Sequence, residues 1–339
     1  MSDSLFFRTS RAERDMPPLR GEDGLNDAVI PLALHRAQLD LAKGPGHEAA
    51  PIPRVSPATA PLQEAPANAE GPIAPAVKEM AQAVATTPAD PVFRNRGRLY
   101  LVSRSRGGVG ATTFAVNLAL GLCQTTQKAK RRVAVVDFDL QFGTLGSSLD
   151  LADKGGLLAL AQLDYEPDVH AIRAALQLHE SGLSVLPAPR HPVPLDALDA
   201  ARVQSIIDAL LESHDAVVVD LPPALVDWLE PLLRRAERLF MVTDLAVTSI
   251  DCAKRILDTF REDAPELRVD IIVGREKKPL FGGRLHREIV TALNQPLRHW
   301  LPFDPKRARL ALDRGEPLLK MQPRGAWSRG IRKIVGGLE

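Results

Sequence analysis

From residue 97 onward, apolar runs alternate with stretches of helical periodicity, and this alternation constrains the fold most strongly. Near-continuous apolar runs are typical of strands buried on both faces of a sheet. Strands that alternate with helices build parallel βαβ units, whose helices cover both faces. The sequence therefore predicts a three-layer α/β fold around a mostly parallel sheet. The predicted strands are 98–104, 131–140, 182–189, 215–223, 238–244 and 267–274, and the predicted helices are 112–126, 157–163, 169–179, 198–214, 225–236 and 248–262.

A glycine-rich stretch, RSRGGVGATTF (104–114), lies between the first predicted strand and the first predicted helix. In this context glycines let backbone N–H groups point inward, and the helix N-terminus adds the positive end of its dipole, so the loop can bind phosphate. Ala111 stands where such a loop has a lysine. A glycine-rich turn without a ligand is the alternative. The residues predicted to bind the nucleotide are Gly107, Gly108, Val109, Gly110, Ala111, Thr112 and Thr113.

The first 91 residues differ in composition from the rest, since they hold 13 of the 28 prolines, many in alanine-rich text. Such a segment cannot bury enough apolar surface to offset its ordering entropy. We therefore predict that residues 1–91 are mostly disordered. Two short segments, 25–43 and 74–85, have helical patterns, and the first is either a transient helix or docked flap or a segment that folds on a partner.

The bulk composition argues against several classes of protein. A net charge of +1 and 4% aromatic residues give no bulk attraction to nucleic acid or anionic membrane. The basic cluster at 128–132 has no interleaved aromatic residues and is typical of a solvated turn, which disfavours a nucleic-acid partner. Cys123 and Cys252 are too few for a disulfide framework. With no secretory signal pattern and no apolar run of about 18 residues, we expect a cytoplasmic protein.

The C-terminal segment 327–339 has the pattern of a short basic amphipathic helix. Glycines weaken such a helix. Packing on the domain or fraying is favoured, and peripheral contact with a membrane is the alternative. We therefore divide the chain into the N-terminal region 1–91, a nucleotide-binding domain at 92–325 and this tail at 326–339.

RGGVGATT (106–113) followed by VNLA resembles the deviant phosphate loop, or deviant Walker A motif, of the MinD/ParA ATPases. Further segments resemble the family in the same order, so that the resemblance spans residues 97–325; they are 135–146, 214–225, 242–258 and 301–319. The Gly-Ala-Thr-Thr text and DLQFGT (139–144) are similar to the pilus-assembly branch (CpaE/TadZ). Many members of that branch carry an N-terminal receiver-like domain, which residues 1–91 do not resemble.

This resemblance implies a P-loop NTPase fold that binds ATP and Mg²⁺, forms a homodimer and works with pilus-assembly proteins. It places the protein at a cell pole or at the inner face of the membrane, where a Tad-type pilus (Tad/Flp pilus) is assembled. An active ParA-type partitioning ATPase and a nucleotide-free scaffold of the same fold are the alternatives.

The resemblance also assigns roles by position. Thr112 matches the hydroxyl that ligates Mg²⁺, Asp220 matches the carboxylate that holds the ion through water, and Asp137 matches a carboxylate near it. Asp139 matches the residue that positions the attacking water. Hard oxygen ligands suit Mg²⁺, and a carboxylate near an in-line water suits phosphoryl transfer. We therefore predict Thr112, Asp137 and Asp220 as metal residues and Asp139 as catalytic.

Two departures from the family pattern affect the expected chemistry. Arg106 stands where the family has a signature lysine that reaches across a dimer, and Ala111 removes the second lysine. Arginine keeps a permanent charge and a fork that suits phosphate, so Arg106 is predicted to be a catalytic residue that replaces part of the lost charge, in cis or in trans. We expect nucleotide binding to be retained and hydrolysis to be weak or lost. Gly274 and Arg275 replace the family's Asn-Arg pair, which leaves base selectivity open.

Overall fold

The computed structural model describes residues 97–124, 131–279 and 283–338. The predictions for residues 1–91 lie outside the described residues. Within them the chain forms an eight-stranded sheet of order β3-β4-β2-β5-β1-β6-β7-β8, parallel except for β3. The strands are β1 (Arg98–Arg104), β2 (Val133–Asp137), β3 (Gln177–Leu178), β4 (Ser184–Leu186), β5 (Ala216–Asp220), β6 (Arg238–Thr243), β7 (Val269–Val273) and β8 (His299–Trp300).

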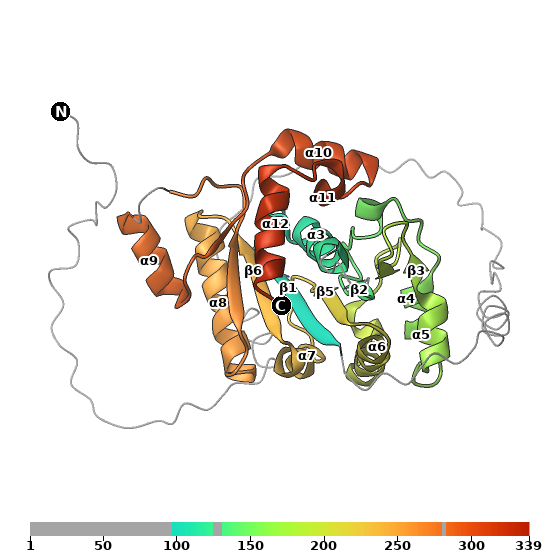
Figure 1. Cartoon of the computed structure of the whole chain (residues 1–339). Coiled ribbons are helices and arrows are strands. Elements are labelled where there is room, and N and C mark those ends of the chain that lie inside the picture. The colour runs from blue at the N-terminus through green and yellow to red at the C-terminus, as the bar shows by residue number, and fades with distance from the viewer. Residues whose placement is uncertain (1–96, 125–130, 280–282, 339) are drawn as a thin grey trace, which may run out of the picture. The chain divides into compact units, whose positions relative to one another are not determined.

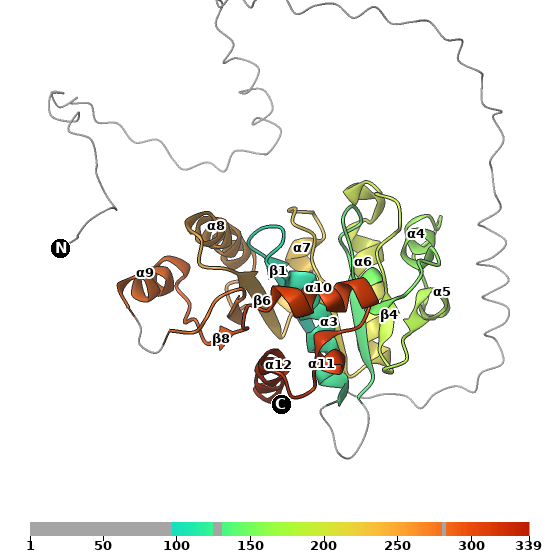
Figure 2. The same cartoon turned by 90° about the horizontal axis from the view of Figure 1, so that it is seen from above.

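Helices cover both faces of this sheet, as Figure 1 and the view from above in Figure 2 show. Leu99 and Leu101 of β1 belong to the core that α6, α7 and α8 cover, whereas Tyr100 and Val102 face α3 and α12. Because strand side chains alternate between faces, one strand serves both cores. The predicted three-layer α/β fold is confirmed. The helices are α3 (Ala111–Gln124), α4 (Gly156–Ala161), α5 (Val169–Ala175), α6 (Ala200–Ser213), α7 (Leu229–Arg235), α8 (Val247–Asp263), α9 (Arg284–Leu293), α10 (Pro305–Arg314), α11 (Leu318–Met321) and α12 (Ala326–Gly336).

The helix predicted over 169–179 is too long at its C-terminal end. The observed α5 ends at Ala175, and Leu176 has extended backbone angles. Gln177–Leu178 then pair with β4 as an antiparallel edge strand. A short apolar stretch carries no signal for where a helix stops and a strand begins. Four further elements, α9, β8, α10 and α11, were not predicted from the sequence.

The C-terminal helix α12 packs against α3, as expected for a tail that lies on the domain. Ile331, Ile334 and Val335 are buried in the same core as α3. Gly121 of α3 allows this close approach, because a Cβ there would lie 3.0 Å from a Val335 methyl and 3.1 Å from an Ile331 methyl. No helix in the part of the chain that the structure describes is long and apolar enough to cross a membrane.

The parallel strands bring polar residues together at one edge of the sheet. Asp137 at the end of β2 pairs in register with Asp220 at the end of β5. Arg104 at the end of β1 pairs with Val242 of β6, and Asp244 follows the end of β6. Since carboxyl ends of parallel strands meet at the same edge, these side chains frame the loop that follows β1.

Candidate nucleotide site

The loop between β1 and α3 has the open backbone of an anion-binding turn. Gly108 and Gly110 have φ angles of 77° and 95°, in the left-handed region that favours glycine. A Cβ at either position would meet nothing within 4 Å, so the space beside the loop is open. The Phe114 N–H donates to the Gly110 carbonyl at 2.9 Å, which marks the first turn of α3. The N-terminal N–H groups of this helix are available to a ligand.

A cavity of about 640 Å³ lies against this loop. Its walls comprise residues 108–113, the turn after β7, the segment 301–305 and one side of α10. This volume is in the range of small-molecule sites. The predicted phosphate loop is therefore neither collapsed nor plugged by side chains. Four arginines contribute to the lining, namely Arg104, Arg106, Arg275 and Arg309.

Three buried carboxylates lie at the sheet edge beside the loop. Asp137, Asp139 and Asp220 are each at most 1% exposed. Burial raises the pKa of Asp137 to about 8, and the charge of Asp220 adds to this, while bonds from backbone N–H groups oppose it. Those bonds come from Asp139 at 3.1 Å to Oδ1 and from Leu145 at 3.0 Å to Oδ2. Both oxygens of Asp137 therefore already accept hydrogen bonds from the backbone.

Arg104 supplies a positive charge to this cluster, a role that the sequence analysis missed. Its Nη2 donates to Asp220 Oδ1 at 2.9 Å and to the Leu221 carbonyl at 3.0 Å, and its Nη1 lies 3.5 Å from Asp139 Oδ2. Burial raises the pKa of Asp220, whereas the charge of Arg104 and a hydrogen bond from Thr112 oppose the rise. A basic residue at the end of β1 was the available signal, but it required knowing that β1 neighbours β5.

Arg106 is held by residues of its own chain after β6. Its Nε donates to Ser249 Oγ at 2.7 Å, and its Nη2 donates to Asp244. Burial raises the pKa of Asp244, but hydrogen bonds from Ser249 and the Ala246 N–H, together with Arg106, outweigh burial and lower it. Asp244 is therefore a charged anchor for Arg106. Arg106 is also one of the residues that line the cavity, so the predicted phosphate role is compatible with its place.

The turn after β7 closes the other side of the loop. Arg275 has a φ of 62°, and its Nη1 donates to the Gly108 carbonyl at 3.2 Å. The same guanidinium lies over the Phe303 ring at 5.4 Å from its centroid. Gly274 lies close to the loop, since a Cβ there would be 3.2 Å from the Val109 carbonyl oxygen. Of the two residues that replace the Asn-Arg pair, Arg275 therefore bonds to the phosphate loop and Gly274 lies beside it.

The residues predicted to hold Mg²⁺ lie together, but contacts within the protein already engage their oxygens, which does not suit direct coordination of the ion. Thr112 Oγ1 donates to Asp220 Oδ2 at 2.5 Å, while Arg104 takes Asp220 Oδ1. Both carboxylate oxygens of Asp137 accept hydrogen bonds from backbone N–H groups. Within residues 97–124, 131–279 and 283–338, no group of three or more His, Cys, Asp or Glu side chains has an arrangement that could hold a metal. We therefore derive no step through a metal.

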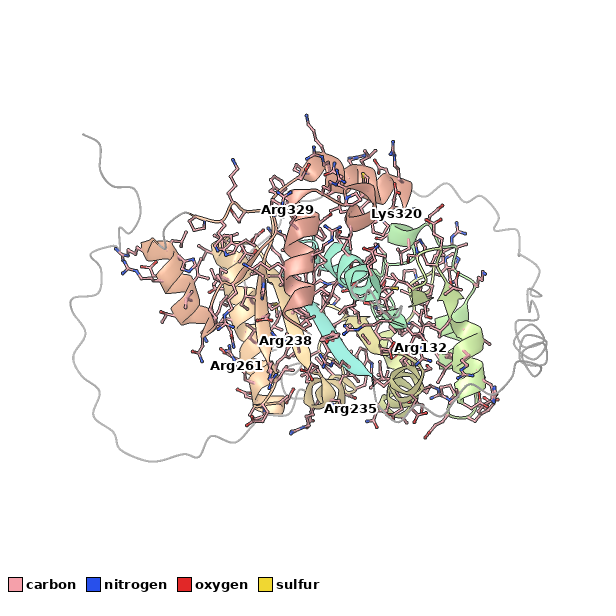
Figure 3. All side chains as sticks on the ribbon, in the orientation of Figure 1. Arg132, Arg235, Arg238, Arg261, Lys320 and Arg329 are labelled. Carbon is pink, nitrogen blue, oxygen red and sulfur yellow. The ribbon has the colours of Figure 1, made fainter. Side chains whose placement is uncertain are left out.

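Other arginines serve the structure away from the site. Figure 3 labels Arg235, Arg238 and Arg261 in the lower part of the view. Arg238 begins β6, at the end of the strand opposite the loop, and its Nη1 pairs with Asp270 at 2.5 Å. Arg132 of the predicted basic cluster pairs with Asp215 at 3.8 Å, and residues 128–130 of that cluster lie outside the described residues.

Residues 97–272 match the family described as an AAA domain. The match covers more than half of the chain. The chain belongs to this family. Among curated proteins, it is similar to the septum site-determining protein MinD of Synechocystis, with 25% identity over 250 residues, covering 71% of this chain and 89% of the relative. It is also 26% identical over 260 residues to an iron-sulfur cluster carrier protein of Helicobacter pylori, covering 72% of this chain and 67% of the relative.

Solved structures show the same fold. A ParA family ATPase from Chlorobium tepidum superposes with a TM-score of 0.63 at 23% identity. The superposition covers 72% of this chain and 100% of the ATPase chain. The cell division ATPase MinD of Pyrococcus furiosus gives a TM-score of 0.57 at 19% identity, covering 71% and 98%. Together with the family match, these relatives support membership of the MinD/ParA superfamily of P-loop ATPases.

Proposed function

We propose that this protein is a nucleotide-binding switch of the MinD/ParA type that binds ATP and hydrolyses it slowly or not at all. The observation that carries this proposal is the open cavity against the glycine loop, with arginines in its lining and Ala111 in place of the lysine. Backbone N–H groups and guanidinium groups can hold phosphate without an ammonium. Two proteins of the same fold support an adenine nucleotide, since a variant of Cyanothece McdA was solved with ATP and Pyrococcus horikoshii MinD with Mg-ADP.

Slow hydrolysis follows from where the remaining cations are held. The transition state of phosphoryl transfer needs cation stabilisation, and losing one such group costs a factor of about 10³ or more. Arg104 is engaged by Asp220, and Arg106 is engaged by Asp244 and Ser249 of its own chain. Because of this anchoring, we infer that Arg106 acts on the nucleotide of its own subunit.

For the cellular role, we propose localisation and assembly of a Tad-type pilus, with the ATP-bound protein as a homodimer that presents a surface to pilus-machine proteins. The support is the similarity of DLQFGT (139–144) and of the Gly-Ala-Thr-Thr text to the CpaE/TadZ branch. A switch needs only that ATP binds the two states with different affinity. A deletion strain that keeps normal pili, or a fluorescent fusion spread evenly through the cell, would contradict this role.

The biochemical proposal is tested by titrating ATP and ADP by calorimetry while molecular mass is measured by analytical ultracentrifugation. We expect ATP to bind and to shift the protein towards a dimer, with turnover well below that of lysine-bearing relatives. Turnover that DNA or liposomes stimulate would favour the ParA-type alternative. Absence of heat and of any thermal shift with either nucleotide would favour the scaffold alternative.

A further inference from the structure

The guanidinium of Arg104 lies where a cation is needed at the end of the sheet. It comes from the last residue of β1, between β5 and β6 in the sheet. Its Nη2 lies 2.9 Å from Asp220 Oδ1, and its Nη1 lies 3.5 Å from Asp139 Oδ2. The side chain is 14% exposed and both carboxylates are at most 1% exposed. Buried carboxylates require such a partner, because an unpaired buried charge is costly.

The carboxylate of Asp220 is fully buried, and both of its oxygens have partners within the protein. Oδ1 faces Arg104, and Oδ2 accepts the hydroxyl hydrogen of Thr112 at 2.5 Å. The same Arg104 nitrogen also donates to the Leu221 carbonyl at 3.0 Å, and this second bond helps to hold the guanidinium against Asp220. A divalent ion that contacted Asp220, directly or through the water that the resemblance implies, would have to displace Arg104 or Thr112 from this buried carboxylate.

Arg104 also lines the cavity beside the phosphate loop. Ala111 stands where such a loop has a lysine, and it carries no charge. The positive charge that a bound polyphosphate meets on this side of the cavity is therefore that of arginines.

We propose that Arg104 is the resident cation of this site and that the protein binds nucleotide without a divalent metal ion. The guanidinium places one positive charge beside Asp139 and Asp220 and occupies the Asp220 oxygen that a metal ion or its water would need. The nucleotide part of this proposal rests on the proposed function, whereas the metal part concerns the ligand-free protein. Arg104 is thus a positioning residue that decides whether the carboxylates take a metal.

The first experiment uses the full chain without nucleotide and Mn²⁺ as the probe, with free Mn²⁺ measured by electron paramagnetic resonance. Wild type is expected to leave the free Mn²⁺ signal unchanged. Arg104→Met is expected to bind Mn²⁺ at least about tenfold more tightly than wild type, and Arg104→Met with Asp220→Asn is expected to lose this gain. Binding by wild type equal to that of Arg104→Met overturns the proposal, and so does absence of binding by Arg104→Met. Circular dichroism checks that each variant is folded.

The second experiment needs only the wild type. ATP affinity is measured by calorimetry in Mg²⁺ and in EDTA, and the two values are expected to agree within about threefold. A larger loss of affinity in EDTA overturns the proposal, even where Arg104→Met does not fold. If ATP binds under neither condition, the proposed function fails, while the Mn²⁺ experiment still decides the role of Arg104.

Discussion

Replacing Arg104 by methionine removes the cation beside the buried carboxylates of Asp139 and Asp220 and is expected to destabilise the protein in a pH-dependent way. Without it, one further carboxyl has to take up a proton in the folded state. A carboxyl has a pKa of about 3.9 in the unfolded chain, so protonation costs about 5 kcal/mol at pH 7.5 and about 2 kcal/mol at pH 5.5. Breaking a buried pair by removing one partner costs a similar ~3–5 kcal/mol. Because Asp139 and Asp220 are at most 1% exposed, solvent screening reduces this little.

The sign of the pH effect follows from proton binding. In the variant, the carboxyl whose pKa is raised binds more protons in the folded state than in the unfolded state. The destabilisation of the variant therefore grows as pH rises above about 4. Urea denaturation at pH 5.5 and pH 7.5 measures the loss relative to wild type at each pH. Arg234→Met is the matched control, because Arg234 and Glu230 form an ion pair in which both side chains are more than half exposed. The control is expected to change stability by no more than about 1 kcal/mol at either pH. A loss for Arg104→Met that matches the control, or one that is equal at both pH values, would refute this reasoning.

Three further predictions concern other parts of the molecule. Burial raises the pKa of Asp270, but hydrogen bonds from His299 and Arg238 outweigh burial and lower the pKa to about 2. Asp270→Asn should therefore cost about 2 kcal/mol of stability near pH 7. In urea titrations, wild type should lose stability as pH falls from about 4 to 2, and the variant should not show this loss. Gly121→Ala should destabilise by about 1 kcal/mol, since its methyl would lie near 3 Å from methyls of α12; an unchanged midpoint would contradict that packing. Ala111→Lys should raise steady-state ATP turnover by about tenfold or more, because it adds a cation at the phosphates, and a rate equal to wild type would count against the account of slow hydrolysis.

The sequence predicts most of the sheet because its buried strands are nearly continuous apolar runs. VAVVD (133–137) and AVVVD (216–220) are fully buried over their whole length, and such runs leave few alternatives to a parallel strand. The short edge strands β3 and β8 have no such signal. Gln177–Leu178 is a strand because β4 offers free backbone groups beside it, which is a property of the tertiary structure.

In the site, too, local features could be predicted from the sequence, whereas contacts between distant residues could not. The glycine loop was predictable because its positive φ angles demand glycine at Gly108 and Gly110. The anchoring of Arg106 on Asp244 and the pairing of Arg104 with Asp220 were not, because they depend on β1 lying between β5 and β6. Arg106 and Asp244 are 138 positions apart along the chain, and Arg104 and Asp220 are 116 positions apart. No spacing rule in a single sequence indicates such pairs.

The central claim is that the loop at 107–113 holds a polyphosphate without its lysine, and one calorimetric comparison tests it most directly. Gly108 and Gly155 have φ angles of 77° and 72°, and a Cβ on either would meet nothing within 4 Å. Alanine at either position therefore imposes a similar backbone strain of about 1–2 kcal/mol, but Gly155 lies at the start of α4, outside the lining of the cavity. We predict that wild type binds ATP, that Gly108→Ala weakens binding about tenfold or more, and that Gly155→Ala binds within about twofold of wild type. ATP binding that is absent from wild type, or that both substitutions leave equal, would contradict the account.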